Sequence, residues 1–141
     1  MTTFSTSRTF AATPAQIFAA FQPERLARWW GPAGFSNTFE ICEFRPGGRW
    51  VFTMHGPDGK TYANENVFLE IEPLKRVVIQ HIPAPRFVLT ITLEPVKDGT
   101  LLNWVQVLED ADFARTVAHI ITPANEQNLD RLTVELARNT G

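Results

Sequence analysis

Much of the chain alternates between apolar and polar positions with a period of two. Residues 2–10 place Phe4 and Phe10 on one side of an extended backbone, which is the pattern of a half-buried strand. Residues 35–109 continue this period in segments separated by short turns, so neighbouring strands should pair antiparallel. The six further strands expected are 35–44, 50–55, 61–72, 77–82, 87–95 and 101–109.

A helical period replaces this alternation directly after the first strand. Thr13 is a candidate N-cap and Pro14 suits the first helical position. Pro23 then begins a second short helix, which Gly31 and Pro32 should end.

The C-terminal part is helical again, from about residue 110 onwards. Asp110 or Asp112 can cap a short first segment. Thr122 and Pro123 look like another N-cap and first helical position, so we expect Pro123 to interrupt the run. The main helix should then cover about 123–138.

Together these elements predict one α+β domain spanning residues 1–141. Seven antiparallel strands would form its sheet, with two short helices after the first strand and a long C-terminal helix. A sheet covered by a helix on one face must curl. A cavity remains wherever the helix does not fill the concave side, which is the route from this pattern to ligand binding.

Composition narrows the class of protein. The 141 residues are 44% hydrophobic and 20% charged, which is enough for a core without a metal or disulfide staple. The net charge of -2 argues against a nucleic-acid-binding protein. The single cysteine, Cys42, favours a reducing cytoplasm. No apolar run suits a membrane span or signal peptide, so we expect a cytoplasmic protein without membrane insertion.

Five segments carry a resemblance to a known family. They are "ERLARWWGPAGF", "RPGGRWVFTMHGPDGKTY", "VFLEIEPLKRVVI", "TLEPVKDGT" and "NLDRL". In this order they resemble the SRPBCC superfamily, also called START-related or birch-pollen-allergen-like, over nearly the whole chain. The best match within it is the branch named after the activator of the ninety-kDa heat-shock protein ATPase. The resemblance implies a helix-grip fold, in which a curved seven-stranded sheet wraps around the long helix with a pocket between them.

The resemblance is much less specific about function than about fold. The branch includes co-chaperone domains and antibiotic self-resistance proteins, and related branches include polyketide cyclases and lipid carriers. It implies no universal catalytic residue. The eukaryotic co-chaperone has a further N-terminal domain that drives its chaperone contact, so the length of this chain does not support that role. A chaperone-interacting stress-response module stays an alternative.

Two departures from the family pattern affect the expected pocket. Ala124 and Asn125 stand where relatives often have Gly-Trp, and Asn66 stands where they often have a glycine. Both changes can reshape the cavity, so the ligand of a relative cannot be assumed for this chain.

The histidines form no recognisable catalytic or metal motif. The spacing of His55, His81 and His119 matches no compact zinc site, and no cofactor motif is present. We therefore expect no metal and no cofactor. His81 shares a strand face with Val77 and Ile79, so it would be a polar group in an apolar pocket if that face is concave.

The glutamates of the fourth expected strand also have an ordinary explanation. Glu65 and Glu70 point to opposite faces because they are an odd number of positions apart. Glu70 matches a recurrent family glutamate, and we expect it to pair with Lys75 or Arg76 rather than act as a general base. Catalysis is therefore not expected, with a cyclase- or hydrolase-like enzyme as the alternative.

Aromatic and apolar side chains on the inner strand faces are the candidate pocket. One interpretation is that they simply fill the core. The other is an apolar cavity with a few polar groups, the usual makeup of a small-molecule site, here for a small apolar or aromatic ligand. An exposed apolar patch would instead serve a partner protein or a symmetric homodimer. The pocket candidates are Trp30, Trp50, Phe52, Met54, Asn66, His81, Leu89, Ile91, Trp104, Gln106 and Asn128.

The stretch "RWWGPAGF" joins the second short helix to the second strand. Trp29 and Trp30 are adjacent, so they cannot face the same way on a helix. We expect Trp30 to pack under the end of the sheet and Trp29 to lie partly exposed at the pocket rim or in an interface. Gly31, Pro32 and Gly34 should set the exit of the chain.

Overall fold

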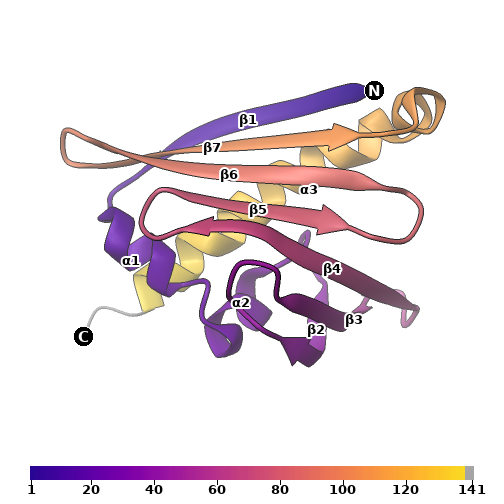
Figure 1. Cartoon of the computed structure of the whole chain (residues 1–141), viewed down its shortest axis with the longest axis horizontal. Helices are drawn as coiled ribbons and strands as arrows, with labels where there is room; N and C mark the ends of the chain where they lie inside the picture. The colour runs from indigo at the N-terminus through magenta and orange to yellow at the C-terminus, as the bar shows by residue number, and fades with distance from the viewer. Residues whose placement is uncertain (139–141) are drawn as a thin grey trace.

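The computed structural model describes residues 1–138 and contains one seven-stranded antiparallel sheet and three helices (Figure 1). This is the α+β, helix-grip arrangement that the sequence predicts. The strands are β1 Thr2–Phe10, β2 Ser36–Cys42, β3 Arg49–His55, β4 Thr61–Glu72, β5 Arg76–His81, β6 Phe87–Val96 and β7 Gly99–Leu108. The helices are α1 Pro14–Ala19, α2 Pro23–Trp29 and α3 Ala111–Arg138.

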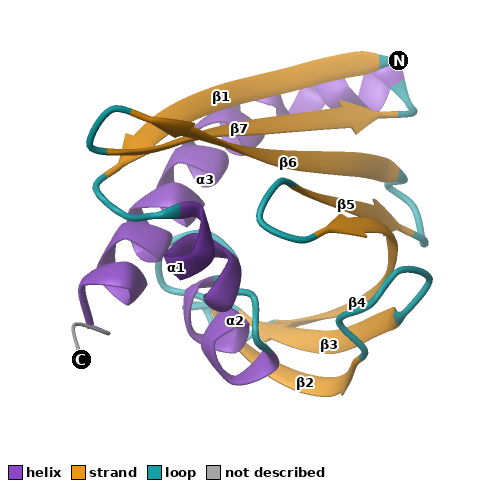
Figure 2. Cartoon of the chain, turned by 60° about the vertical axis from the view of Figure 1, so that its left-hand side comes forward, coloured by secondary structure: helices purple, strands orange, loops and turns teal. Residues whose placement is uncertain are grey.

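Bulges in two of the seven paired strands help the sheet to curl. The strand order is β1-β7-β6-β5-β4-β3-β2, so β1 is brought beside β7 at one edge. Register shifts fall in β2 between Phe39 and Ile41 and in β4 between Phe68 and Glu70. Bulges bend a strand and increase its twist. The β2–β4 part therefore turns out of the plane of the other strands (Figure 2).

The start of α1 confirms the expected cap. The Thr13 hydroxyl accepts from the Gln16 backbone N–H at 3.1 Å, and the Thr13 N–H donates to the Gln16 side chain at 2.8 Å. This reciprocal pair satisfies two backbone groups that the first turn would leave free. Pro14 occupies the first helical position.

The expected break at Pro123 is wrong, because α3 runs without interruption from Ala111 to Arg138. Proline inside a helix costs about 3 kcal/mol, mainly for one lost hydrogen bond and a steric clash. Packing on both sides of it offsets this cost, since Ala114 is buried before Pro123 and Leu129 after it. The Asp110 carboxylate caps the helix, accepting from the Asp112 and Phe113 N–H groups at 3.0 and 3.1 Å.

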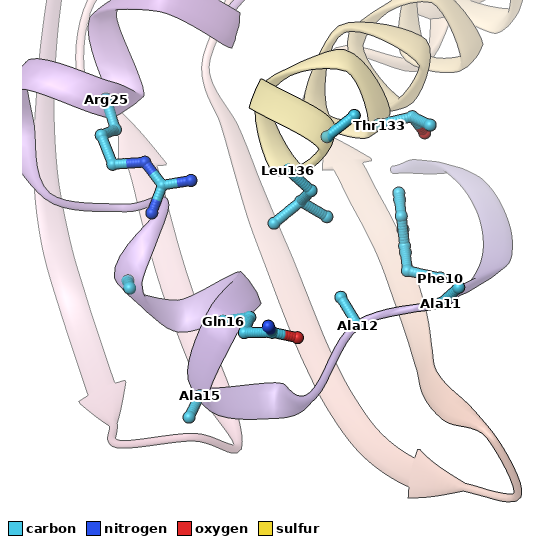
Figure 3. A pocket seen from close by; sticks show the side chains of 10 residues that line it. Phe10, Ala11, Ala12, Ala15, Gln16, Arg25, Thr133 and Leu136 are labelled. Carbon is cyan, nitrogen blue, oxygen red and sulfur yellow. The ribbon is translucent and has the colours of Figure 1, made fainter. Parts of the chain in front are cut away.

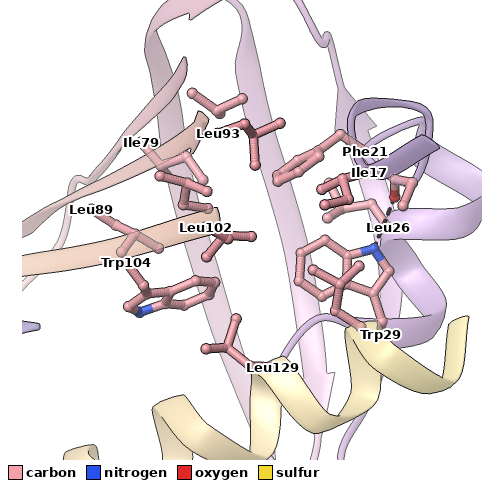
Figure 4. Close-up of a cluster of buried hydrophobic side chains, with 14 of the residues drawn as sticks. Ile17, Phe21, Leu26, Trp29, Ile79, Leu89, Leu93, Leu102, Trp104 and Leu129 are labelled. Carbon is pink, nitrogen blue, oxygen red and sulfur yellow. Dashed lines mark hydrogen bonds between the residues drawn. The ribbon is translucent and has the colours of Figure 1, made fainter. Parts of the chain in front are cut away.

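The core lies between the concave side of the sheet and the helices (Figure 4). Leu102 and Trp104 of β7 face Leu129 of α3, while α1 and α2 contribute Ile17 and Leu26 at one end. Leu89, Ile91 and Leu93 are all buried, so the odd-numbered face of β6 is the inner one, as the sequence predicts.

The two adjacent tryptophans have the opposite roles to those expected. Trp29 is only 1% exposed, and its indole N–H donates to the Ala20 carbonyl at 2.8 Å. Its ring also meets Phe21 edge to face at 5.3 Å. Trp30 is the half-buried one. The free carbonyl at the end of α1 gives the Trp29 indole a buried acceptor, and the sequence does not show that this carbonyl lies nearby.

Candidate functional site

Residues 28–35, here called the tryptophan loop, are held in place by α3. Arg131 donates from Nη2 to the Arg28 carbonyl at 2.7 Å and from Nη1 to the Trp30 carbonyl at 2.9 Å. Nη1 also lies 3.1 Å from the carbonyls of Gly31 and Pro32. Burial lowers the pKa of Arg131, but a guanidinium keeps its charge. One side chain therefore satisfies four loop carbonyls.

Asn128, a predicted pocket residue, is used by the same loop. Its amide nitrogen donates to the Trp29 carbonyl at 2.9 Å, and its amide oxygen accepts from the Gly31 N–H at 3.2 Å. The side chain is 5% exposed. Its hydrogen-bonding groups face the backbone, so Asn128 positions the loop around Trp30.

Glu135 lies two turns beyond Asn128 on α3 and fixes α2. Its carboxylate, 2% exposed, accepts from Arg25 Nε at 2.9 Å and from Arg28 Nε and Nη2 at 2.9 and 2.8 Å. The hydrogen bonds from Arg28 and then Arg25 hold the pKa of Glu135 below its usual range, although burial acts in the opposite direction. The carboxylate is therefore ionised at neutral pH.

Trp30, Trp50 and Trp104 meet beneath this loop and form the tryptophan cluster. The Trp30 ring lies 4.9 Å from Trp50 and 5.5 Å from Trp104, measured between ring centroids. Trp50 and Trp104 are 0% and 2% exposed, whereas Trp30 is half-buried. Trp30 thus covers two buried tryptophans that belong to opposite parts of the sheet, β3 and β7.

Two polar atoms of this cluster have no partner. The indole N–H groups of Trp50 and Trp104 are buried, and neither finds an acceptor among residues 1–138. By contrast, the Trp29 indole is paired. Buried donors are nearly always hydrogen-bonded in proteins, so two unpaired donors in one cluster are unusual.

The polar groups predicted near the cluster are mostly engaged. Asn66, 3% exposed, donates to the Trp50 carbonyl at 3.3 Å. The Gln106 amide oxygen accepts from Asn125 at 3.1 Å. Asn125, which stands where relatives often have tryptophan, therefore ties α3 to β7.

His81 belongs to the β5–β6 connection. Its ring stacks on Phe87 at 4.8 Å and with an interplanar angle of 3°. Nδ1 lies 3.0 and 2.9 Å from the carbonyls of Pro83 and Pro85, and Nε2 lies 3.2 Å from the Asn64 side-chain oxygen. Both ring nitrogens are thus engaged with the protein, and the ring lies on the inner side of the sheet, which the sequence leaves open.

The remaining predicted pocket residues also lie inside the molecule. Met54 is half-buried and pairs across the hairpin with Tyr62, while Phe52, Leu89 and Ile91 are buried. Three surface hollows of about 830, 510 and 280 Å³ are lined by other residues. None of the eleven candidates lines these three hollows, and their role as a ligand pocket stays a prediction.

No arrangement typical of catalysis is evident in the described residues. Glu70 accepts from Arg76 at 3.0 Å, which confirms the expected ion pair. Burial raises the pKa of the Cys42 thiol to about 11, so it is protonated and a poor nucleophile at neutral pH. Within residues 1–138, no three His, Cys, Asp or Glu side chains converge as metal ligands.

The sequence reasoning did not identify Arg131 and Glu135, which organise the loop. A signal for Arg131 was present, because it is part of the family-like segment "NLDRL" at 128–132. Glu135 lies outside that segment, and its pairing with Arg25 and Arg28 bridges more than 100 positions. No local pattern could have indicated it.

Comparisons with known proteins agree with this architecture. Solved structures with the same fold include an Arthrobacter aurescens protein, 24% identical over 99% of this chain and 88% of that chain, with a TM-score of 0.89. A Rhodobacter sphaeroides protein is 28% identical over 98% of this chain and 93% of that chain, with a TM-score of 0.85. The AHSA1 protein of Silicibacter pomeroyi is 21% identical over 97% and 99%, with a TM-score of 0.78.

The family of the chain is shown by a match to a family model rather than by a single related protein. The curated proteins contain no match. No helix in residues 1–138 has both the length and the apolar character needed to cross a membrane. The family model described as activator of Hsp90 ATPase homolog 1-like protein matches residues 11–137. The chain therefore belongs to the activator of Hsp90 ATPase homolog 1-like family, a branch of the SRPBCC superfamily.

Proposed function

We propose that this protein binds a small apolar or aromatic molecule that carries one hydrogen-bond acceptor, at the tryptophan cluster beneath Trp30. The observation that carries the proposal is the pair of buried, unpaired indole N–H groups on Trp50 and Trp104. A ligand acceptor would satisfy one of them, and the surrounding rings would contact its apolar part.

The energetic argument rests on the cost of unpaired donors. A buried donor without a partner costs about 1–3 kcal/mol relative to a paired one. A core that only needed bulk could use Phe at positions 50 and 104 and avoid this cost. A ligand that accepts from either indole would offset it, which supports binding rather than simple filling.

Trp30 is the side chain that can admit such a ligand. Its backbone is fixed at both ends, since its N–H donates to the Leu26 carbonyl at 3.0 Å and its own carbonyl accepts from Arg131 and from Asn37 at 2.9 Å. Its ring, however, is only half-buried. The ring can therefore rotate outward without disturbing the loop and expose Trp50 and Trp104.

The ligand can be identified by native mass spectrometry of protein purified from its own host, followed by extraction and identification of any bound molecule. A defined probe is also available in 2-acetonaphthone, with 2-ethylnaphthalene as the matched compound without an acceptor. Proton–nitrogen NMR spectra resolve the indole N–H signals individually. We expect the ketone to move the Trp50 or Trp104 signal downfield and to leave the Trp29 signal in place.

Conservative variants separate the N–H group from the ring. Trp104→Phe and Trp50→Phe should weaken binding of the ketone about five-fold where the lost donor is the one used. Trp29→Phe is the matched control, because its N–H is already paired within the protein. Equal binding of both naphthalenes, or equal weakening by the Trp29→Phe control, would show that the indole donors do not recognise a ligand.

A further inference from the structure

A hollow of about 830 Å³ opens at the C-terminal end of α3 (Figure 3), and no residue of the tryptophan cluster lines it. We call it the end groove. The end of β1, the turn into α1 and the last turns of α3 enclose it, and Arg25 of α2 reaches into it. Its lining residues are Phe10, Ala11, Ala12, Ala15, Gln16, Ala19, Arg25, Thr133, Leu136 and Ala137.

Most of the side chains that line the end groove are small and apolar. Five of its ten lining residues are alanines, and Phe10 and Leu136 add the larger apolar surfaces. Alanine side chains are too short to reach across the space between α1 and α3, so the hollow stays open. Its volume is in the range typical of small-molecule sites.

The polar side chains of the groove chiefly offer hydrogen-bond donors. The Gln16 amide oxygen is engaged by the Thr13 N–H at 2.8 Å, which leaves its NH₂ group free to donate. The Thr133 hydroxyl is the exception, because its single O–H already donates to the Leu129 carbonyl at 3.0 Å. Arg25 donates from Nε to Glu135 at 2.9 Å, and among residues 1–138 its two Nη nitrogens have no acceptor.

Arg25 shares its carboxylate partner with Arg28. Both guanidiniums contact the single buried carboxylate of Glu135, while the Glu24 carboxylate also acts on Arg28. Only Arg25 of the two lines the groove. An anion entering here would meet free N–H groups of a guanidinium, which suits carboxylate geometry.

We propose that the end groove binds an amphipathic carboxylate. Its apolar chain lies against the alanines, Phe10 and Leu136, and its carboxylate accepts from the Nη groups of Arg25. This site is separate from the tryptophan cluster and takes a charged ligand, whereas the cluster offers two neutral donors.

Decanoate is a direct probe, with decanol and decylamine as matched compounds of the same chain length. We expect decanoate, below its micelle-forming concentration, to saturate one site and shift the backbone NMR signals of Ala11–Ala19 and Thr133–Ala137. One charge-assisted contact should make decanoate bind about ten-fold more tightly than decanol. Decylamine should bind more weakly than decanol.

Arg25→Gln and Arg28→Gln form a matched pair of variants. Each removes one guanidinium from Glu135, but only Arg25→Gln removes the groove's cation. Decanoate binding should weaken about ten-fold in Arg25→Gln and change little in Arg28→Gln. Ala15→Phe provides a second test that spares Glu135, because the exposed Ala15 position tolerates the change while its ring blocks the groove.

Several outcomes would overturn the proposal. These are equal binding of decanoate and decanol, equal loss in Arg25→Gln and Arg28→Gln, or unchanged binding in Ala15→Phe. If the groove signals shift with protein concentration alone, a second copy of the chain occupies the groove instead. Trp104→Phe should leave decanoate binding unchanged, so failure of this site and failure of the tryptophan-cluster site are distinguishable.

Discussion

The backbone of the tryptophan loop and the side chains beneath it differ sharply in how well their polar groups are satisfied. Arg131 alone reaches four loop carbonyls, and Asn128 pairs with the backbone on either side of Trp30. Directly below, the buried indoles of Trp50 and Trp104 have no acceptor within the described residues. A well hydrogen-bonded frame therefore surrounds a centre whose donors are not all paired, which is what we expect if the cluster is the proposed binding site.

The largest loss of stability is expected at Glu135, which joins α3 to α2 and to Arg28 at the start of the tryptophan loop. Glu135→Ala should lower the free energy of unfolding by about 3 kcal/mol, because it leaves the Arg25 and Arg28 guanidiniums without their buried partner. Urea denaturation measures this loss. Asp130→Ala on the same helix is the control, since the Arg8–Asp130 pair is exposed and should contribute less than about 1 kcal/mol. Similar losses of unfolding free energy in the two variants would show that the buried Glu135 pairs stabilise the protein no more than an exposed ion pair does.

The same residue makes the frame dependent on pH. Because the folded-state pKa of Glu135 is lowered, its stabilisation is complete above the unfolded glutamate pKa of about 4.3 and is lost as pH falls through the lower folded value. The advantage of the wild-type protein over Glu135→Gln should thus stay constant from neutral pH down to about pH 5 and shrink below about pH 4. Unfolding measured across this range tests the sign.

A smaller effect is expected at Arg131. Arg131→Lys keeps the charge but replaces a planar fork by one ammonium, which cannot reach the carbonyls of both Arg28 and Pro32. The free energy of unfolding should fall by about 2 kcal/mol, and the Trp30 indole N–H signal in proton–nitrogen NMR spectra should report a looser loop. Arg115→Lys on the exposed part of α3 should change stability by less than about 0.5 kcal/mol. A neutral Arg131→Lys would show that the four contacts do not stabilise the loop.

Gly31 should give the smallest of these effects. Its φ is +97°, and an added Cβ would lie 2.7 Å from the Met54 methyl carbon, so Gly31→Ala combines backbone strain with a close contact. We expect a loss of about 1–2 kcal/mol in thermal unfolding. Gly59, with φ +85° and open space around it, isolates the strain, so Gly59→Ala should cost about 1 kcal/mol. A larger loss at Gly59 would contradict tight packing between the loop and Met54.

Local patterns predicted the elements well, and tertiary packing accounts for the errors. Alternation located all seven strands, and the Thr13–Pro14 pair marked the start of α1. The helix-breaking character of Pro123 is also local, but it was overridden because both halves of α3 pack against the rest of the molecule. Which of Trp29 and Trp30 is buried depended on the Ala20 carbonyl, and chain folding alone brings it near.

In the candidate site too, the sequence predicted which side chains face inward but not which hydrogen bonds they form. Period-two patterns placed Trp50, Trp104 and Leu89 on the inner face, because strand geometry alternates side chains regardless of context. Patterns of this kind carry no information on hydrogen bonds between distant segments. The engagement of Asn128 by the loop backbone therefore emerged only from the fold, as did the unpaired indoles.

By itself, the sequence determined the order of elements, the antiparallel sheet, the inner faces of β6 and β7, and the family, because these follow from periodicity, turn residues and ordered motifs. Only the tertiary structure decided that Trp30 packs over Trp50 and Trp104, that Glu135 joins α3 to α2, and that a groove opens beside Arg25. Each of these depends on groups far apart in the chain meeting at distances of a few ångströms, and no local pattern encodes such meetings.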